Sequence, residues 1–147
     1  MKCYLLIGFG LLGCILIGTA CKNKTAGAPA AASSDFITFY ERFLSDSLFQ
    51  IEHIQFPLEG IPDNADSADV ADGNFRWQRE NWKMHRKFDP KQTGFKVNLE
   101  TFGSDIITER ILHKSGGYAM LRRYAKMDGD WHLIYYAGLN PLAEAEE

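Results

Sequence analysis

The hydrophobic positions of this chain change their spacing several times, and the first stretch is almost unbroken. One lysine, Lys2, precedes an apolar run over residues 4–17. This run of about 14 residues is shorter than the roughly 20 that a helix needs to cross a bilayer, and it matches the core of a secretion signal. The small residues 18–20 follow and lead directly to Cys21. The pattern therefore predicts a signal peptide over residues 1–20.

The segment around Cys21 resembles the bacterial lipobox, in which the cysteine thiol receives a diacylglyceryl group before cleavage. Ala20 fits the position before the cysteine, whereas Gly18 departs from the usual Leu, Val or Ile. Cys14 is a competing site, but cleavage there would leave the apolar residues 15–17 on the mature chain. An uncleaved or unlipidated segment is a third alternative. We expect lipidation at Cys21. A lipidated N-terminal cysteine would carry two or more acyl chains, enough to anchor the protein stably to a membrane.

Residues 22–34 are polar at first and then rich in Ala, Gly, Pro and Ser. Such a composition has no apolar face to bury and is typical of a flexible tether. A structured N-terminal arm is the alternative. We expect one domain over residues 35–142, followed by an acidic tail over residues 143–147.

The domain begins with a helical period. Apolar residues three and four positions apart predict a helix over residues 35–48; they are Phe36, Ile37, Tyr40, Phe43, Leu44 and Leu48. Residues 49–58 then alternate between apolar and polar, which predicts a strand. Pro57 has no backbone N–H to donate, so we expect it at a sheet edge or a strand end.

The rest of the chain predicts a loop and then a sheet. Residues 59–74 are polar and suit an exposed loop with a short helical turn. A short strand over residues 75–78 and a helical or irregular stretch follow. Four longer strands are expected over residues 95–102, 105–114, 118–127 and 131–139. Asp128-Gly129 is a strong hairpin signal, and Pro141 ends the last strand. The fold class is α+β, a curved antiparallel sheet of about four to six strands packed on the N-terminal helix.

Several of these features together carry a resemblance. The N-terminal helix, the run over residues 49–58, the pair Trp77 and Trp82, and the final strand with Trp131 resemble a Bacteroidetes lipoprotein family of unknown function, domain-of-unknown-function family 4348. That family is similar to nuclear transport factor 2 proteins and cystatin-like folds, in which a curved sheet wraps around helices into a cone. The resemblance covers residues 35–142. It implies no chemistry, because this fold hosts isomerases, dehydratases and plain binding modules.

Composition excludes several classes of protein. Hydrophobic residues make up 46% and aromatics 13% of the 147 residues, so a core can form. The formal net charge is −3, and it becomes −4 when Lys2 leaves with the signal (−3 − 1). This acidic balance argues against a nucleic-acid partner. All three cysteines, Cys3, Cys14 and Cys21, are N-terminal, so the domain has no disulfide, cysteine zinc site or cysteine nucleophile.

Metal and cofactor motifs are weak or missing. Acidic residues recur every third position in the predicted loop, with Glu59 nearby; they are Asp63, Asp66, Asp69 and Asp72. This spacing differs from a calcium-binding EF-hand, so we expect a solvated loop and keep calcium as the alternative. The four histidines show no zinc-enzyme spacing; a zinc site assembled from distant strands is the alternative. No phosphate-binding or nucleophile motif is present, and no cofactor or metal is predicted.

The aromatic load of the sheet suggests a ligand pocket. On the strand over residues 118–127, one face carries Arg122 and Tyr124, and the partner strand adds Trp131 and Tyr135 to the same side. If this face lines the cone, Arg122 is a buried cation that needs an anion, either Glu109 or a ligand carboxylate. The alternative is that Arg122 reaches water while the aromatics fill the core. The pocket candidates are Arg122, Tyr124, Trp131, Tyr135, Glu109 and Trp77.

The sequence therefore favours a non-catalytic module that binds a small ligand or an envelope protein. A small isomerase- or dehydratase-like enzyme is the alternative, with Glu109, Glu52 or His53 as acid or base. A structural envelope protein that acts through its outer face is a third possibility. Acidic residues directly after the anchor resemble a surface-export signal. Here Lys22 follows the anchor, and such acidic residues are missing. We expect the domain to be attached to the membrane and to face the periplasm rather than the cell surface.

Overall fold

The computed structural model describes residues 32–142; the predicted signal peptide, Cys21, most of the tether and the acidic tail lie outside the described residues. Six strands form one sheet in the order β2-β1-β6-β5-β4-β3. They are β1 (Ile54–Ile61), β2 (Arg76–Trp77), β3 (Phe95–Phe102), β4 (Ile106–His113), β5 (Tyr118–Met127) and β6 (Asp130–Pro141). Neighbouring strands are antiparallel except β1 and β6, which run parallel. The predicted α+β class is confirmed.

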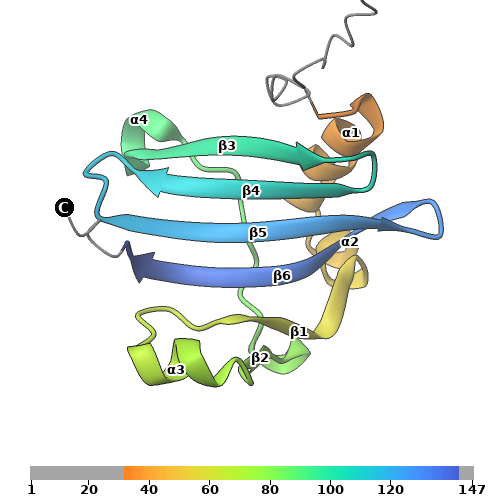
Figure 1. Cartoon of the computed structure of the whole chain (residues 1–147). Coiled ribbons are helices and arrows are strands. Elements are labelled where there is room, and N and C mark those ends of the chain that lie inside the picture. The colour runs from red at the N-terminus through yellow and green to blue at the C-terminus, as the bar shows by residue number, and fades with distance from the viewer. Residues whose placement is uncertain (1–31, 143–147) are drawn as a thin grey trace, which may run out of the picture.

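Short helices surround this sheet. They are α1 (Ser34–Phe43), α2 (Ser47–Glu52), α3 (Ser67–Asp72), α4 (Pro90–Thr93) and the 3₁₀ turn η1 (Arg79–Asn81). Figure 1 shows α1 and α2 behind one face of the sheet, and α3 beside β1. Within residues 32–142, no helix is both long enough and apolar enough to span a membrane.

The single helix expected over residues 35–48 is in fact two helices. The first helix ends at Phe43, and Asp46 caps the second. The Asp46 carboxylate accepts hydrogen bonds from the backbone N–H groups of Leu48 and Phe49, both at 3.1 Å. The strand expected from residue 49 therefore begins only at Ile54. The apolar spacing continues across the cap, which is why periodicity alone misplaces this boundary.

The sequence suggested that Pro57 lies at a sheet edge or a strand end, and this is wrong, because Pro57 lies within β1. Strand β1 lies between β2 and β6, and Pro57 falls where the register between β1 and β6 shifts, between Ile54 and Glu59. The missing N–H of proline is tolerated there because the regular ladder is already interrupted.

The C-terminal meander follows the prediction closely. Strands β3 and β5 have the expected bounds, and the β5–β6 turn places Asp128 and Gly129 at φ values of 51° and 97°. These positive values suit a tight hairpin turn. A register shift between Arg123 and Tyr124 on β5 changes the alternation along β6. As a result Tyr136, and not Tyr135, is the buried tyrosine beside Arg122.

The core lies between the sheet and α1, on the face that we call the inner face. It is built mainly from aromatic and aliphatic side chains of α1, β5 and β6, including Phe36, Phe43, Tyr124, Trp131 and Leu133. Figure 1 also shows the chain between β2 and α4 crossing the sheet on this same side. This crossing segment, residues 82–89, therefore covers the part of the inner face that α1 leaves open.

Candidate functional site

A buried ion pair lies at the centre of the inner face. Glu109 on β4 and Arg122 on β5 are direct cross-strand partners. One terminal nitrogen of Arg122, Nη1, donates to Glu109 Oε2 at 3.1 Å and to Oε1 at 3.3 Å. The side chain of Arg122 is 2% exposed, and that of Glu109 is 0% exposed. Of the alternatives raised by the sequence, the structure shows Arg122 buried and paired with Glu109.

Two tyrosines complete the coordination of the Glu109 carboxylate. The hydroxyl of Tyr40 on α1 donates to Oε1 at 2.6 Å, and that of Tyr124 on β5 donates to Oε2 at 3.0 Å. Burial and the nearby charge of Glu109 raise the pKa of both hydroxyls above the usual range, so both remain protonated donors. Each carboxylate oxygen thus accepts a tyrosine and an arginine hydrogen bond, which leaves Glu109 poorly placed to exchange a proton with a substrate.

Gln50 on α2 fixes the crossing segment over the sheet, although the sequence did not single it out. Its side chain is fully buried. The amide oxygen accepts from the backbone N–H of His85 at 2.8 Å and from Trp82 Nε1 at 3.1 Å. The amide nitrogen donates to the carbonyl oxygens of Phe43 at 2.6 Å and of His85 at 3.0 Å. Periodicity gives no signal for such a residue, since its partners lie on two separate segments.

His85 brings an imidazole into the same region. Its ring lies 4.5 Å from the ring centres of both Trp82 and Tyr136. Burial, and secondarily the positive charge of Arg122, lower the pKa of His85 to about 2, so the imidazole is neutral at physiological pH. Within the described part of the chain, the buried Nδ1 atom of His85 has no hydrogen-bond partner.

The sequence-predicted pocket residues do not come together as one group. Glu109, Arg122 and Tyr124 share the buried cluster. Trp131 lies against Phe36 and donates from Nε1 to an Asp35 oxygen at 3.0 Å.

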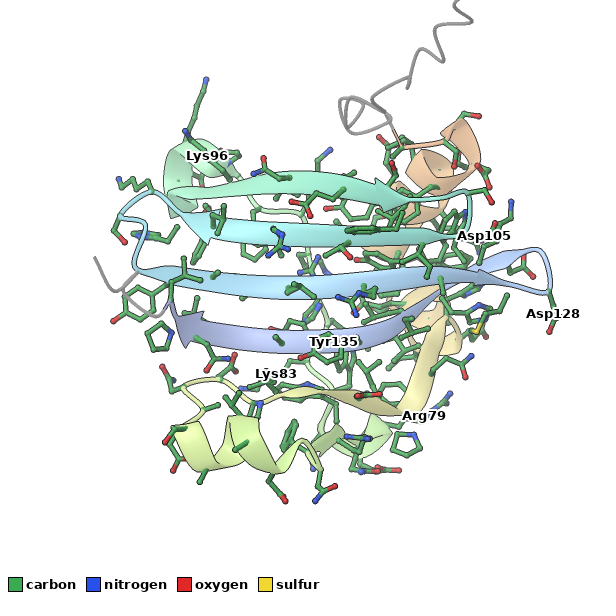
Figure 2. The ribbon with its side chains drawn as sticks, in the orientation of Figure 1. Arg79, Lys83, Lys96, Asp105, Asp128 and Tyr135 are labelled. Atoms are coloured by element: carbon green, nitrogen blue, oxygen red, sulfur yellow. The ribbon has the colours of Figure 1, made fainter. Side chains whose placement is uncertain are left out.

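The other two candidates lie elsewhere. Trp77 is on β2, where its Nε1 donates to the carbonyl oxygen of Tyr136 at 3.0 Å. Tyr135, labelled on β6 in Figure 2, is half-buried and has the Arg123 guanidinium 5.6 Å from its ring centre. The strict alternation assumed for β6 would have placed Tyr135 beside Trp131, and the register shift explains the difference.

The acid–base alternatives also lie apart from the cluster. Glu52 is exposed at the end of α2. His53 stacks on Phe49 with 3.8 Å between ring centres, and its Nδ1 lies 2.8 Å from the Phe49 carbonyl oxygen. Among the residues that the structure describes, no group of three or more His, Cys, Asp or Glu side chains is arranged to hold a metal ion, and the side chain of Asp69 is not among those described.

An open groove of about 310 Å³ lies mainly on the opposite, outer face of the sheet. Most of its lining is apolar and comes from β4, β5, β6 and α3, including Leu112, Ala119, Leu121, Ala137 and Val70. The charged side chain in its lining is Arg110 on β4, whose Nε donates to Glu100 Oε1 at 3.0 Å. The groove thus joins an aliphatic floor to one cationic rim residue.

Two side chains hold the wall of this groove in place. Asn140 at the end of β6 accepts from the backbone N–H of Ala65 at 2.7 Å and donates to the Pro62 carbonyl oxygen at 2.9 Å. The Asp63 carboxylate accepts from the backbone N–H of Leu139 at 2.7 Å. One acid of the predicted calcium loop therefore has a structural role, since it ties the loop before α3 to the last strand.

Comparison with known proteins identifies the family. A family model described as "Domain of unknown function (DUF4348)" matches residues 23–138. The chain belongs to the DUF4348 family. This confirms the resemblance to domain-of-unknown-function family 4348 that the sequence indicated. A search of the curated proteins found no match.

Two solved structures are similar to parts of this DUF4348 protein. A nuclear transport factor 2-like (NTF2-like) protein from Bacteroides fragilis is 16% identical, with a TM-score of 0.48 over 75% of this chain and 48% of that chain. A cystatin-like protein from Bacteroides caccae is 17% identical, with a TM-score of 0.49 over 76% of this chain and 80% of that chain. The chain thus spans about half the length of the B. fragilis protein. These similarities concern the fold.

Proposed function

We propose that this protein is a lipid-anchored lipoprotein of the bacterial envelope whose domain binds a small amphipathic anion in the outer groove, without catalysis. The ligand would have a short aliphatic chain, which the apolar floor buries, and an acidic head group, which Arg110 attracts. The observation that carries the proposal is the groove itself, whose volume of about 310 Å³ falls within the range typical of ligand pockets.

The buried cluster at the centre of the inner face argues against catalysis there. An isomerase or dehydratase needs an acid or base that a substrate can reach. Glu109 is fully buried, and both of its carboxylate oxygens already accept hydrogen bonds from Arg122, Tyr40 and Tyr124. We therefore assign this cluster a structural role and place ligand binding on the other side of the sheet.

Filling the groove is expected to weaken binding strongly. Octanoate is a suitable probe, and octanol tests the role of charge. Ala137→Trp places an indole on the groove floor and should weaken octanoate binding at least ~10-fold in isothermal titration, since the ligand and the indole compete for one space. Arg110→Met should weaken octanoate but leave octanol unchanged.

The matched control is Ala125→Trp, on β5 outside the groove lining. It should bind octanoate like the unmodified protein, and thermal melts should verify that both variants fold. Equal binding by Ala137→Trp would show that the groove is not the site.

The anchor is tested separately at the two candidate cysteines. Cys21→Ser removes the thiol that we expect to carry lipid, so the chain should lose incorporation of labelled palmitate and fail to be processed at residue 20. Cys14→Ser is the control and should remain processed, labelled and firmly membrane-bound. Membrane fractionation with a mobility assay distinguishes these results. A Cys21→Ser chain that is still processed and firmly bound would contradict the lipoprotein assignment.

A further inference from the structure

A second, smaller cavity lies on the inner side of the sheet beside Tyr136, separate from the groove. Its volume is about 60 Å³. Four aromatic rings and two charged side chains line it: Trp77, Trp82, His85, Tyr136, Asp63 and Lys83. A cavity of this size holds a group larger than one water molecule and smaller than a drug-sized ligand. We call it the aromatic cavity.

The indole walls are held in fixed positions. Trp77 and Trp82 meet at 90° with 6.2 Å between ring centres, and Trp82 lies 5.6 Å from Tyr136. Each indole N–H is already engaged, that of Trp77 by the Tyr136 carbonyl oxygen and that of Trp82 by Gln50. The indoles therefore offer ring surface rather than donors.

Strand β1 makes room for one of these walls. A Cβ atom at Gly60 would collide with the carbonyl oxygen of Tyr136 and would lie 2.8 Å from Trp77 Nε1. Glycine at this position lets the indole of Trp77 lie directly over the strand. Both the backbone at Gly60 and the side chain of Trp77 therefore shape the wall of the cavity.

The polar atoms around the aromatic cavity suit a donor that carries positive charge. Asp63 contributes a carboxylate, of which Oδ1 accepts from the Leu139 N–H. His85 also lines the cavity, and its Nδ1 atom is buried and has no hydrogen-bond partner among the described residues. The charge of buried Arg122 is offset by Glu109. Aromatic faces attract cations, and a carboxylate strengthens that attraction.

We propose that the aromatic cavity binds a primary ammonium group, R–NH₃⁺, at the end of a small amine. Such a group can donate to the Asp63 carboxylate and to His85 Nδ1 while its charge lies against the indole and phenol rings. A quaternary ammonium has no N–H to donate and is larger. Lys83, at the rim, opposes the bound charge and therefore weakens the interaction.

The test is a fluorescence titration of the full-length protein in a non-ionic detergent. The probe is methylammonium chloride, read through tryptophan emission, with potassium chloride at equal ionic strength as the baseline. We expect saturable binding in the millimolar range, and at least ~10-fold weaker binding of tetramethylammonium. An equal response to potassium or tetramethylammonium would overturn the proposal.

Matched variants separate charge at the cavity from charge elsewhere. Asp63→Asn keeps an acceptor for Leu139 but removes the charge, and should weaken methylammonium binding about 10-fold. Asp128→Asn, at the β5–β6 turn, changes the net charge equally and should have no effect. Figure 2 labels Asp128 and Lys96 well away from Lys83. Lys83→Met should tighten binding about 3-fold, whereas Lys96→Met should not.

Two further variants keep the proposal falsifiable if Asp63→Asn disturbs its loop. His85→Phe keeps an aromatic ring, removes the Nδ1 acceptor and should weaken binding several-fold. Ala137→Trp, in the groove, should leave methylammonium binding unchanged, so the two sites can fail independently. The assignment would be overturned if both Asp63→Asn and His85→Phe bound methylammonium as the unmodified protein does. It would also be overturned if the protein bound acetate saturably and Lys83→Met abolished that binding.

Discussion

Glu109→Gln is expected to lower the free energy of unfolding by about 3–5 kcal/mol, because it leaves the charge of Arg122 buried without a counter-ion. The substitution keeps the size of the side chain, so the loss reports charge rather than a cavity. Arg122 is 1% exposed and cannot reach water without opening the core. Urea unfolding followed by circular dichroism measures the change. An unchanged slope of the unfolding free energy against urea concentration would show that the unmodified protein and the variant expose the same surface on unfolding.

Glu100→Gln is the matched control, since Glu100 pairs with Arg110 on the outer side of the sheet. Those side chains are 37% and 49% exposed, and exposed pairs typically contribute about 0–1 kcal/mol. The double variant Glu109→Leu with Arg122→Met removes both charges and should recover part of the loss. A Glu109→Gln effect no larger than that of Glu100→Gln would mean that the buried pair is not the electrostatic centre of the fold.

The sequence alone identified both members of this ion pair as candidates, because strand alternation and hairpin turns set the register of the strands. The turn at residues 115–117 fixes which β4 residue faces Arg122, and Glu109 was the acid available on the neighbouring strand. Tyr40 could not be foreseen as the third partner. It lies 69 positions from Glu109, and in the helical pattern it is simply one more apolar position.

Local chemistry explains where the expectations failed. Asp46 interrupts an amphipathic pattern that would otherwise continue, and a register shift exchanges Tyr135 for Tyr136 on the inner face. Both effects depend on a single backbone position. Hydrophobic periodicity averages over several residues, so it predicts that a helix or strand exists better than it predicts where each side chain points.

The crossing segment has the largest consequence for function. A cone formed by a curved sheet and a helix can hold a ligand between them. Here Phe88 brings its ring to within 5.9 Å of the Arg122 guanidinium, and Trp82 and His85 cover Tyr136. The middle of the inner face is therefore occupied by the protein itself. This shifts the candidate sites to the outer groove and to the aromatic cavity at the margin of the inner face.

Gln50→Leu tests whether the segment over the inner face depends on one side chain. The variant leaves the backbone N–H and carbonyl of His85, the Phe43 carbonyl and the Trp82 indole N–H without their amide partner. Because each buried unpaired group costs about 1–3 kcal/mol, we expect a loss of about 3–4 kcal/mol after partial relaxation. Urea unfolding measures this loss.

Hydrogen exchange distinguishes this mechanism from a general weakening of the core. In Gln50→Leu, amides of residues 82–88 should exchange faster at low denaturant, while those at the centres of β4 and β5 change only with global stability. Gln55→Leu, at an exposed position of β1, is the control and should alter stability by no more than about 0.5 kcal/mol. Uniformly faster exchange over the sheet and over residues 82–88 would contradict the role assigned to Gln50, since a local tether should release the crossing segment before the strands beneath it.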